Sequence, residues 1–242
     1  MHVTGVTLDI DWAPDVVIDR VAGLLLERGV AATWFVTHRS AAVERLRDRP
    51  DLFELGIHPN FLPGSTQGRT HEEVLEHCLD LVPDAISMRT HSLYQSTPLL
   101  ALVAETTPIE VDASILLMHT TIASLTTFTW NGRTLTRVPV YWEDDLAMEE
   151  ANASWSLDAA ELENEGVRIY DFHPIHVYLN SSEMGPYRSL RSSSPLIASD
   201  ERTLAPYIGR GAGTGTMFAQ LLDHLATRGD AVRVRDLRVE TR

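Results

Sequence analysis

The sequence predicts an α/β fold in which helices wrap a mostly parallel sheet. Short stretches rich in β-branched residues alternate along the chain with segments of helical period, which is typical of strand–helix units. The length of 242 residues suits one large α/β domain, and the 44% apolar composition is enough for a substantial core. We see no interdomain linker and no internal repeat beyond this alternation, so we expect a single domain over residues 1–242.

Four strand–helix units are predicted in the first half of the chain. The pairs are 3–10 with 14–28, 31–36 with 41–47, 52–57 with 70–81, and 86–89 with 98–104. Gly29 follows the last apolar position of the first helix and is expected to end it. A further apolar stretch, 109–111, ends in Asp112 and is predicted to be a strand.

The second half of the chain is less regular. Stretches 126–130 and 134–140 flank Asn131-Gly132, a strong turn signal, and predict a hairpin. Residues 167–172 predict a late buried strand, and 214–228 predict a C-terminal helix closed by Gly229. Between these two elements, residues 180–213 carry serine, proline and glycine and are mostly without period, so we expect a long loop or disorder there.

The charged residues exclude several classes of chemistry. The chain has 20 basic and 34 acidic side chains, a net charge of −14, and every basic residue is arginine. Without lysine there is no Schiff-base chemistry, no pyridoxal phosphate attachment and no Walker-type phosphate loop. The acidic balance argues against nucleic acid or an anionic membrane surface as a partner.

Cys78 is the only cysteine, which excludes an internal disulfide and a thiolate metal cluster. No stretch approaches the roughly 20 apolar residues of a membrane span, and the N-terminus lacks the pattern of a signal peptide. We therefore expect a soluble, cytoplasmic protein.

Polar residues that bind metals or move protons stand at the ends of five predicted strands. Active sites of wound or barrel α/β folds collect at the carboxyl ends of the strands, so this set is the main functional signal. Its members are Asp9 and Asp11, His58, Arg89 and His91, Asp112, and His173.

Asp9 and Asp11 are two residues apart. On a continuing strand both would face one side, where two carboxylates repel each other unless a cation or a shared proton separates them. The alternative is that Asp11 caps the helix that begins near Pro14 while Asp9 faces solvent.

His58 and His173 each follow an apolar strand and precede a proline. Proline ends the ladder and leaves each imidazole at the mouth of its strand. On an extended chain His176 would point away from His173, so we expect only His173 to enter the site. Aspartate and histidine together suit zinc or another divalent first-row metal in an open catalytic site.

Three weaker patterns are given other interpretations. His71-Glu72-Glu73 lacks the second histidine of HExxH, because Leu75 stands in its place. The glycine-rich stretch 209–215 does not match a dinucleotide loop and predicts a flexible loop with Thr214 capping the last helix. The acids 143–145 are interpreted as a helix N-terminus, with the preceding aromatic pair 141–142 as an alternative sugar site.

With these strand-end residues, the sequence resembles the polysaccharide deacetylases of the NodB-homology group, carbohydrate esterase family 4. The segments TLDID, ATWFV, ELGIH, RTHSL and DFHP fall in the order and near the spacings of that family's motifs, across residues 4–178. The divergent branch associated with bacterial O-antigen and other surface polysaccharides is the most similar. The resemblance implies a distorted (β/α)7 barrel, a divalent metal, most simply zinc with nickel, cobalt, manganese or iron as alternatives, and a carbohydrate substrate.

The resemblance also implies roles for individual residues. Asp9 corresponds to the catalytic base, His173 to the general acid and Arg89 to the arginine that orients the base, while Asp11 and His58 correspond to metal ligands. The family's second motif histidine is replaced by Leu62. We expect His91 to take its place as the third ligand, with Asn60 or His173 as the alternatives.

Together these roles predict metal-dependent hydrolysis of an N-acetyl or related amide on a sugar. Because the second histidine is missing, a carbohydrate-binding or assembly protein on a decayed scaffold stays open. A hydrolase of another ester, cyclic amide or phosphoester also stays open. The loop 180–213, with Tyr187, Arg188 and Arg191, is a candidate substrate-facing cover.

Overall fold

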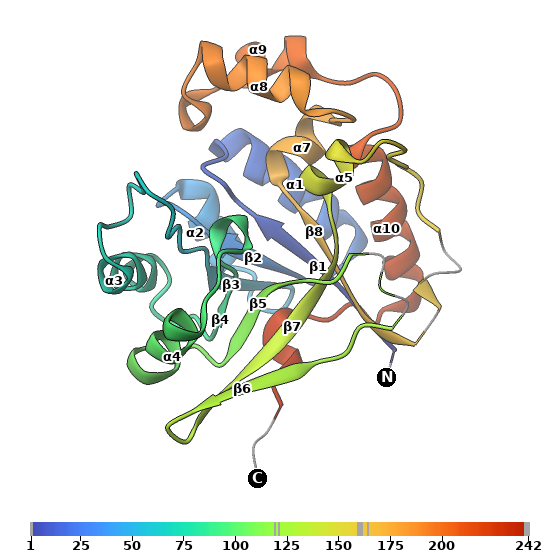
Figure 1. Ribbon diagram of the computed structural model, residues 1–242. Helices are drawn as coiled ribbons and strands as arrows, with labels where there is room; N and C mark the ends of the chain where they lie inside the picture. Colours follow the sequence, from blue (N-terminus) through green and yellow to red (C-terminus); the bar gives the residue numbers. More distant parts are fainter. Residues whose placement is uncertain (1, 119, 121, 159–161, 164, 240–242) are drawn as a thin grey trace.

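Seven parallel strands form a closed ring in the computed structural model, which describes residues 2–118, 120, 122–158, 162–163 and 165–239 (Figure 1). The order around the ring is β1, β2, β3, β4, β5, β7 and β8, and β8 pairs again with β1. The predicted (β/α)7 barrel is therefore confirmed. The strands are β1 (His2–Asp9), β2 (Ala32–Val36), β3 (Phe53–Ile57), β4 (Ser87–Met88), β5 (Val111–Leu116), β7 (Arg133–Glu143) and β8 (Gly166–Phe172).

The barrel is distorted at β4 and at the pairing of β5 with β7. β4 has only two residues, and the pairing of β5 with β7 shifts register between Asp112 and Ile115. The predicted hairpin is present: β6 (Thr126–Trp130) pairs antiparallel with β7, outside the ring. Asn131 and Gly132 both have positive φ, 47° and 79°, as a two-residue type I′ turn requires.

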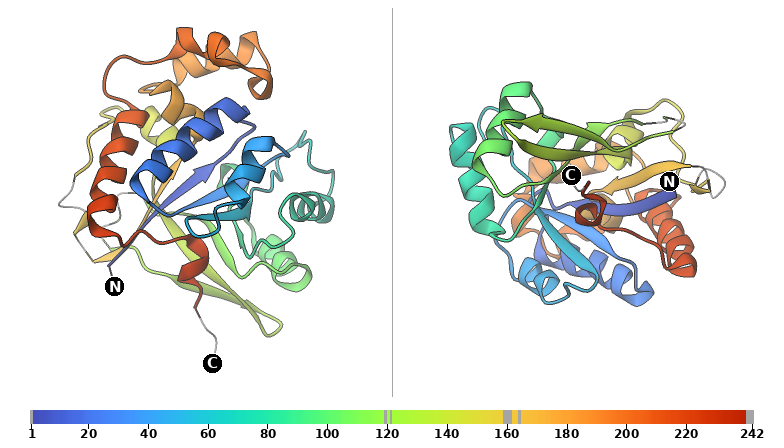
Figure 2. Two further views of the ribbon diagram at one scale, coloured as in Figure 1. Left: turned by 180° about the vertical axis from the view of Figure 1, so that it is seen from behind. Right: turned by 90° about the horizontal axis from the view of Figure 1, so that it is seen from below.

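Helices surround the ring, and some of them lie over its carboxyl end (Figures 1 and 2). They are α1 (Asp15–Arg28), α2 (Ala41–Arg47), α3 (His71–Leu81), α4 (Thr97–Thr106), α5 (Asp144–Glu149), α7 (Pro174–Leu179), α8 (Met184–Ser193), α9 (Glu201–Leu204) and α10 (Thr214–Arg228). In α1, Val17, Val21 and Leu25 recur every fourth residue and are fully buried against the sheet. Gly29 ends this helix in the left-handed conformation, as predicted.

Two predictions from the sequence are wrong. β5 begins where the sequence places its end, so Asp112 is the second residue of the strand and not its exit. Asp112 is fully buried and pairs with Arg137. Residues 180–213 do not form an irregular loop, because they contain α8, α9 and the short 3₁₀ helices η2 (Leu196–Ala198) and η3 (Ala205–Tyr207).

The C-terminal segment closes the amino end of the barrel (Figure 2, right). The 3₁₀ helix η4 (Val234–Leu237) donates the backbone N–H of Val234 to Thr33 and, next to it, that of Arg235 to the buried Glu54. The carboxyl ends of the parallel strands lie at the opposite end, below α5, α7 and α8 in Figure 1. A functional site is expected at this carboxyl end of the barrel. No helix of the described residues is long and apolar enough to cross a membrane.

Candidate metal and catalytic site

The strand-end residues of the sequence come together at the carboxyl end of the barrel. A cavity of about 210 Å³ is lined by Asp9, Asp11, His58, His91 and His173. Arg89 is fully buried and contacts the carboxylate of Asp9. A larger hollow of about 760 Å³ lies between α1, α7 and α10, but Arg20 and Glu201 are the only charged residues in its lining. The smaller cavity is therefore the candidate site, because aspartate and histidine side chains line it.

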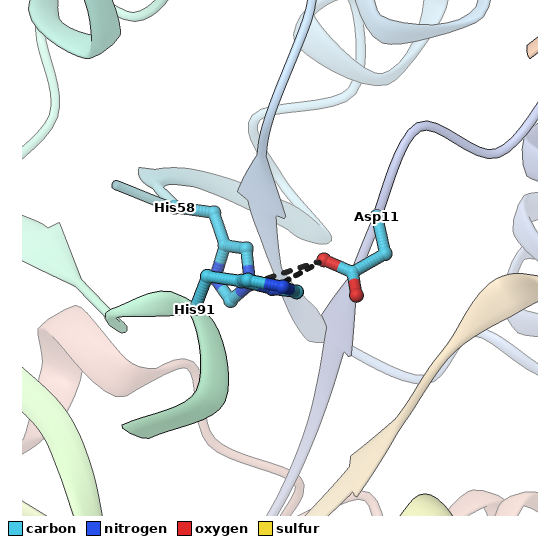
Figure 3. A group of neighbouring side chains, drawn as sticks. All are labelled: Asp11, His58 and His91. Atoms are coloured by element: carbon cyan, nitrogen blue, oxygen red, sulfur yellow. Dashed lines mark hydrogen bonds and ion pairs between the residues drawn. The ribbon is translucent and has the colours of Figure 1, made fainter. Parts of the chain in front are cut away.

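Asp11, His58 and His91 place three potential ligand atoms in a nearly equilateral triangle (Figure 3). Oδ1 of Asp11 lies 3.2 Å from Nε2 of His58 and 3.2 Å from Nδ1 of His91, and the two nitrogens are 3.3 Å apart. In a tetrahedral zinc site with ligand distances of about 2.0–2.1 Å, the ligand atoms are about 3.3–3.4 Å apart. The spacing of these three atoms fits such a site.

The carboxylate of Asp11 supports the same conclusion. Its Oδ1 is buried and lies 3.2 Å from one nitrogen of each imidazole, but it makes no hydrogen bond of good geometry among the described residues. Burial raises the pKa of Asp11, but the imidazoles of His58 and His91 and the charge of His173 outweigh burial and hold this pKa well below its ordinary value. An ionised, buried oxygen without a hydrogen bond is costly unless a cation compensates it.

The backbone reaches this arrangement through two pairs of left-handed residues. Asp11 and Trp12 have φ of 43° and 57°, and Ser92 and Leu93 have φ of 56° and 51°. Such conformations are rare for residues other than glycine and concentrate at functional sites. β1 ends at Asp9, so Asp11 is not on a continuing strand as the sequence suggested. It does not cap α1 either, since the N-cap is Pro14 and no side chain makes a capping hydrogen bond there.

Arg89 links two carboxylates beneath the cavity. Its Nη1 donates to Oδ1 of Asp9 at 2.9 Å and also to Oδ1 of Asp171. Thr7 donates a further hydrogen bond of 2.9 Å to Asp171. The guanidinium group also packs on the ring of Phe35. The orientation of Asp9 is therefore fixed by a buried network.

His173 pairs with Asp144, which the sequence analysis assigned only to a helix N-terminus. Nδ1 of His173 lies 2.7 Å from Oδ1 of Asp144, and the backbone N–H of His173 donates to Oδ2 at 2.9 Å. Burial lowers the pKa of His173, but Asp145 and Asp144 outweigh burial and hold it well above its ordinary value. Burial raises the pKa of Asp144 to about 6, so the proton of the pair resides on His173.

Comparisons with known proteins identify the family to which this chain is similar. A family model, the WbmS-like polysaccharide deacetylases, matches residues 6–191. The crystal structure of WbmS from Bordetella bronchiseptica, described as a polysaccharide deacetylase involved in O-antigen biosynthesis, is 34% identical. The match covers 93% of this chain and 90% of the WbmS chain, with a TM-score of 0.78.

The chain belongs to the WbmS-like polysaccharide deacetylase family.

A more distant structure shares the fold. The Bc1960 peptidoglycan N-acetylglucosamine deacetylase is 12% identical, covers 98% of this chain and 87% of its own, and has a TM-score of 0.50. Comparison with the curated proteins gives no match.

As a WbmS-like deacetylase, the chain departs from the broader motif pattern at Leu62, where a second histidine is expected. The structure brings His91 to Asp11 and His58 in its place. The side chain of Asn60 is engaged within its own loop, where its Oδ1 accepts a hydrogen bond of 3.0 Å from the backbone N–H of Leu62. His173 is more distant, with its Nε2 3.6 Å from Oδ2 of Asp11.

His176 lies beside His173, which differs from the extended-chain expectation, although the cavity is lined by His173 and not by His176, as predicted. His173 is the N-cap of α7 in an extended conformation and His176 lies in the first turn of this helix, so both rings approach Asp145. Nδ1 of His176 lies 3.1 Å from the hydroxyl of Ser181. Burial, helped by the charge of His173, lowers the pKa of His176 to about 3, so this ring is neutral.

Residues 180–213 form a helical cap beside the site of this WbmS-like deacetylase. The cap lies above α5 and α7 in Figure 1. The ring of Tyr187 on α8 packs on His176 with centroids 4.6 Å apart. Arg188 pairs with Glu149 of α5.

The two ends of the cap are joined at Asn180. Its Oδ1 accepts the backbone N–H of Thr216 at 3.0 Å, and its Nδ2 donates to the carbonyl of Gly211 at 2.8 Å. A Cβ on Gly213 would lie 2.4 Å from the carbonyl oxygen of Asn180. The glycine-rich stretch therefore serves close packing of the chain.

Proposed function

We propose that the protein is a metal-dependent hydrolase that removes an acetyl or similar acyl group from an amino sugar or polysaccharide precursor. The convergence of Asp11, His58 and His91 in a cavity also lined by Asp9 and His173 carries the proposal. Membership of the WbmS-like family supports a carbohydrate substrate. The similarity to WbmS, described as acting in O-antigen biosynthesis, supports a surface polysaccharide in particular.

Asp11, His58 and His91 would hold the divalent cation. One carboxylate and two imidazoles suit zinc, and nickel, cobalt, manganese and iron accept the same donors. When bound, such a cation acts as a Lewis acid that polarises a carbonyl group and increases the acidity of water.

Asp9 and His173 would move the protons of the reaction. Asp9, oriented by Arg89, accepts a proton from the water that attacks the amide carbon. His173, held protonated by Asp144, gives its proton to the amide nitrogen as the C–N bond breaks. The products are a carboxylate and the amine of the sugar.

Two further parts of the proposal concern the cap and the location of the protein. We place the cap, residues 180–213, against the bound sugar, because Tyr187 packs on His176 beside the general acid. We place the reaction in the cytoplasm, whose reducing conditions suit a chain with one buried thiol, Cys78.

The experiment that tests the function measures acetate and free amine released from N-acetylated sugars. Metal-free protein should be inactive and should regain activity when one equivalent of zinc is added. Asp9→Asn and His173→Ala should each lose about 10²- to 10⁴-fold in kcat while they retain the metal. Wild-type turnover by Asp9→Asn would contradict the assignment.

Parallel assays separate the alternatives. Release of product only from model esters, cyclic amides or phosphoesters would keep the metal but change the bond. Binding of sugars without metal and without turnover would instead identify a carbohydrate-binding protein.

A further inference from the structure

A second group of potential ligands lies beside the first in the cavity. One ring nitrogen of His173 and one carboxylate oxygen each from Glu143 and Asp145 lie within 4.8 Å of one another. Glu143 ends β7 and Asp145 belongs to the first turn of α5, while His173 follows β8. None of these three residues belongs to the triangle around Asp11. All three line the same cavity.

The acids of this second group are incompletely satisfied. Oε2 of Glu143 and Oδ1 of Asp145 are buried and have no hydrogen-bond partner in the described part of the chain. A buried carboxylate oxygen without a partner is destabilising, since the group loses hydration without a replacement. Such atoms call for a bound water, a proton or a cation.

His173 supplies the independent observation that points to a cation. The side chain is 8% exposed, and Asp144 engages its Nδ1 at 2.7 Å. Its Nε2 has no hydrogen bond among the described residues, and it faces Oδ2 of Asp11 at 3.6 Å. A carboxylate on one ring nitrogen, with the other nitrogen free, is the usual arrangement of a metal-binding histidine. The same arrangement serves a general acid.

We propose that Glu143, Asp145 and His173 form a second divalent-cation site, weaker than the first, whose occupation inhibits the enzyme. Two carboxylates and one imidazole are donors that zinc accepts. The site is weaker because the side chain of Asp145 is 36% exposed.

Inhibition follows from the role of His173, and this part rests on the proposed function. A histidine nitrogen bound to a cation has no proton to give to the departing amine. Excess metal should therefore lower kcat at saturating substrate, while the first metal stays in place.

Calorimetric titration of metal-free protein with zinc chloride tests the binding part without reference to activity. Wild type should bind two equivalents, the second at least about tenfold more weakly than the first. Glu143→Gln and Asp145→Asn should bind the first equivalent and weaken the second at least about tenfold. Glu149→Gln is the matched control, because Glu149 lies at the end of α5 with its carboxylate exposed and paired with Arg188. It should titrate as wild type does.

Activity measured at rising zinc concentration tests the inhibition. Wild type and Glu149→Gln should gain activity up to one equivalent and lose at least about tenfold beyond it, whereas Glu143→Gln should keep whatever activity one equivalent gives. Thermal melting establishes that each variant is folded, and Asp145→Asn provides a second variant if Glu143→Gln is not.

Two results would overturn the proposal. One is a single zinc equivalent in wild type, and the other is a second equivalent that Glu143→Gln and Asp145→Asn bind as tightly as Glu149→Gln does. A protein that binds two equivalents but hydrolyses no acylated sugar would refute the proposed function and leave the second site standing.

Discussion

Nδ1 of His173 and Oδ1 of Asp144 lie 2.7 Å apart in a buried pair that joins the start of α5 to the end of β8. The carboxylate fixes the orientation of the ring and keeps the opposite nitrogen free for the cavity. Since Asp144 and Asp145 hold the pKa of His173 well above its ordinary value, the ring is protonated at neutral pH. A general acid needs this state.

The pair predicts the effect of Asp144→Asn on the pH profile. The amide keeps an acceptor but removes a negative charge, so the pKa of His173 falls. His173 then loses its proton at a lower pH, and activity on the alkaline side is lost first. We expect the basic limb of kcat/KM to move to lower pH and kcat at pH 8 to fall at least about tenfold. An unchanged basic limb in the measured profile would show that Asp144 does not act through His173.

The network beneath the cavity predicts a large loss of stability in Arg89→Met. This change leaves Asp9 and Asp171 as two buried carboxylates without their shared cation. Urea unfolding should show a loss of about 3–5 kcal/mol in the free energy of unfolding. The double variant Arg89→Met/Asp171→Asn should recover part of this loss, because one of the two buried acidic groups is then removed. A double variant less stable than Arg89→Met would contradict the network.

His176 predicts a pH dependence of stability. Its pKa of about 3 in the folded chain lies below the ordinary value of 6.5, so the unfolded chain binds the proton more readily. The contribution of the neutral ring is fully present above pH 6.5 and is lost as the pH falls toward 3, by up to about 1.4 kcal/mol per pH unit. The free energy of unfolding should depend less on pH over this window in His176→Asn than in wild type. Parallel curves for the two proteins would show that His176 is not the buried neutral group.

The closure of the cap predicts a difference between two neighbouring glycines. A Cβ on Gly213 would meet the backbone of Asn180 at 2.4 Å, while a Cβ on Gly211 would have no atom within 4 Å. Gly213→Ala should therefore lower the free energy of unfolding by about 1–3 kcal/mol and Tm by several degrees. Gly211→Ala, the matched control, should melt close to wild type. Equal melting temperatures for the two variants would contradict the close packing at Asn180.

Local patterns were enough to predict a parallel sheet wrapped by helices and several residues that line the cavity, while the closed barrel was implied by the family resemblance. His58 and His173 each stand between an apolar strand and a proline, and the parallel strands bring such positions to one end of the sheet. Asp144 could not be assigned in the same way, because its partner is 29 residues away and its helix-start position has a sufficient local explanation. Asp171 was missed because it lies within an apolar strand. Its partners, Arg89 and Thr7, are brought to it only by the fold.

The differences between the sequence expectations and the structure have physical causes. The side-chain directions of Asp11 and His176 were inferred from the alternation of an extended strand. Asp11 instead has a left-handed backbone conformation, and His176 lies on a helix. The cap was taken for a loop because its helices are short and bury few residues, Leu190 alone in α8 and Leu204 alone in α9, so no apolar period marks them.

The central claim is that His91 completes the metal site in place of the missing histidine at position 62. The most direct test is the affinity for the first zinc equivalent, measured in competition with a chelator, in wild type, His91→Ala and Asn60→Ala. The claim predicts that His91→Ala weakens this affinity at least about 100-fold, while Asn60→Ala stays within about threefold of wild type. Zinc binding by His91→Ala as tight as in wild type, or an equal loss in Asn60→Ala, would contradict it.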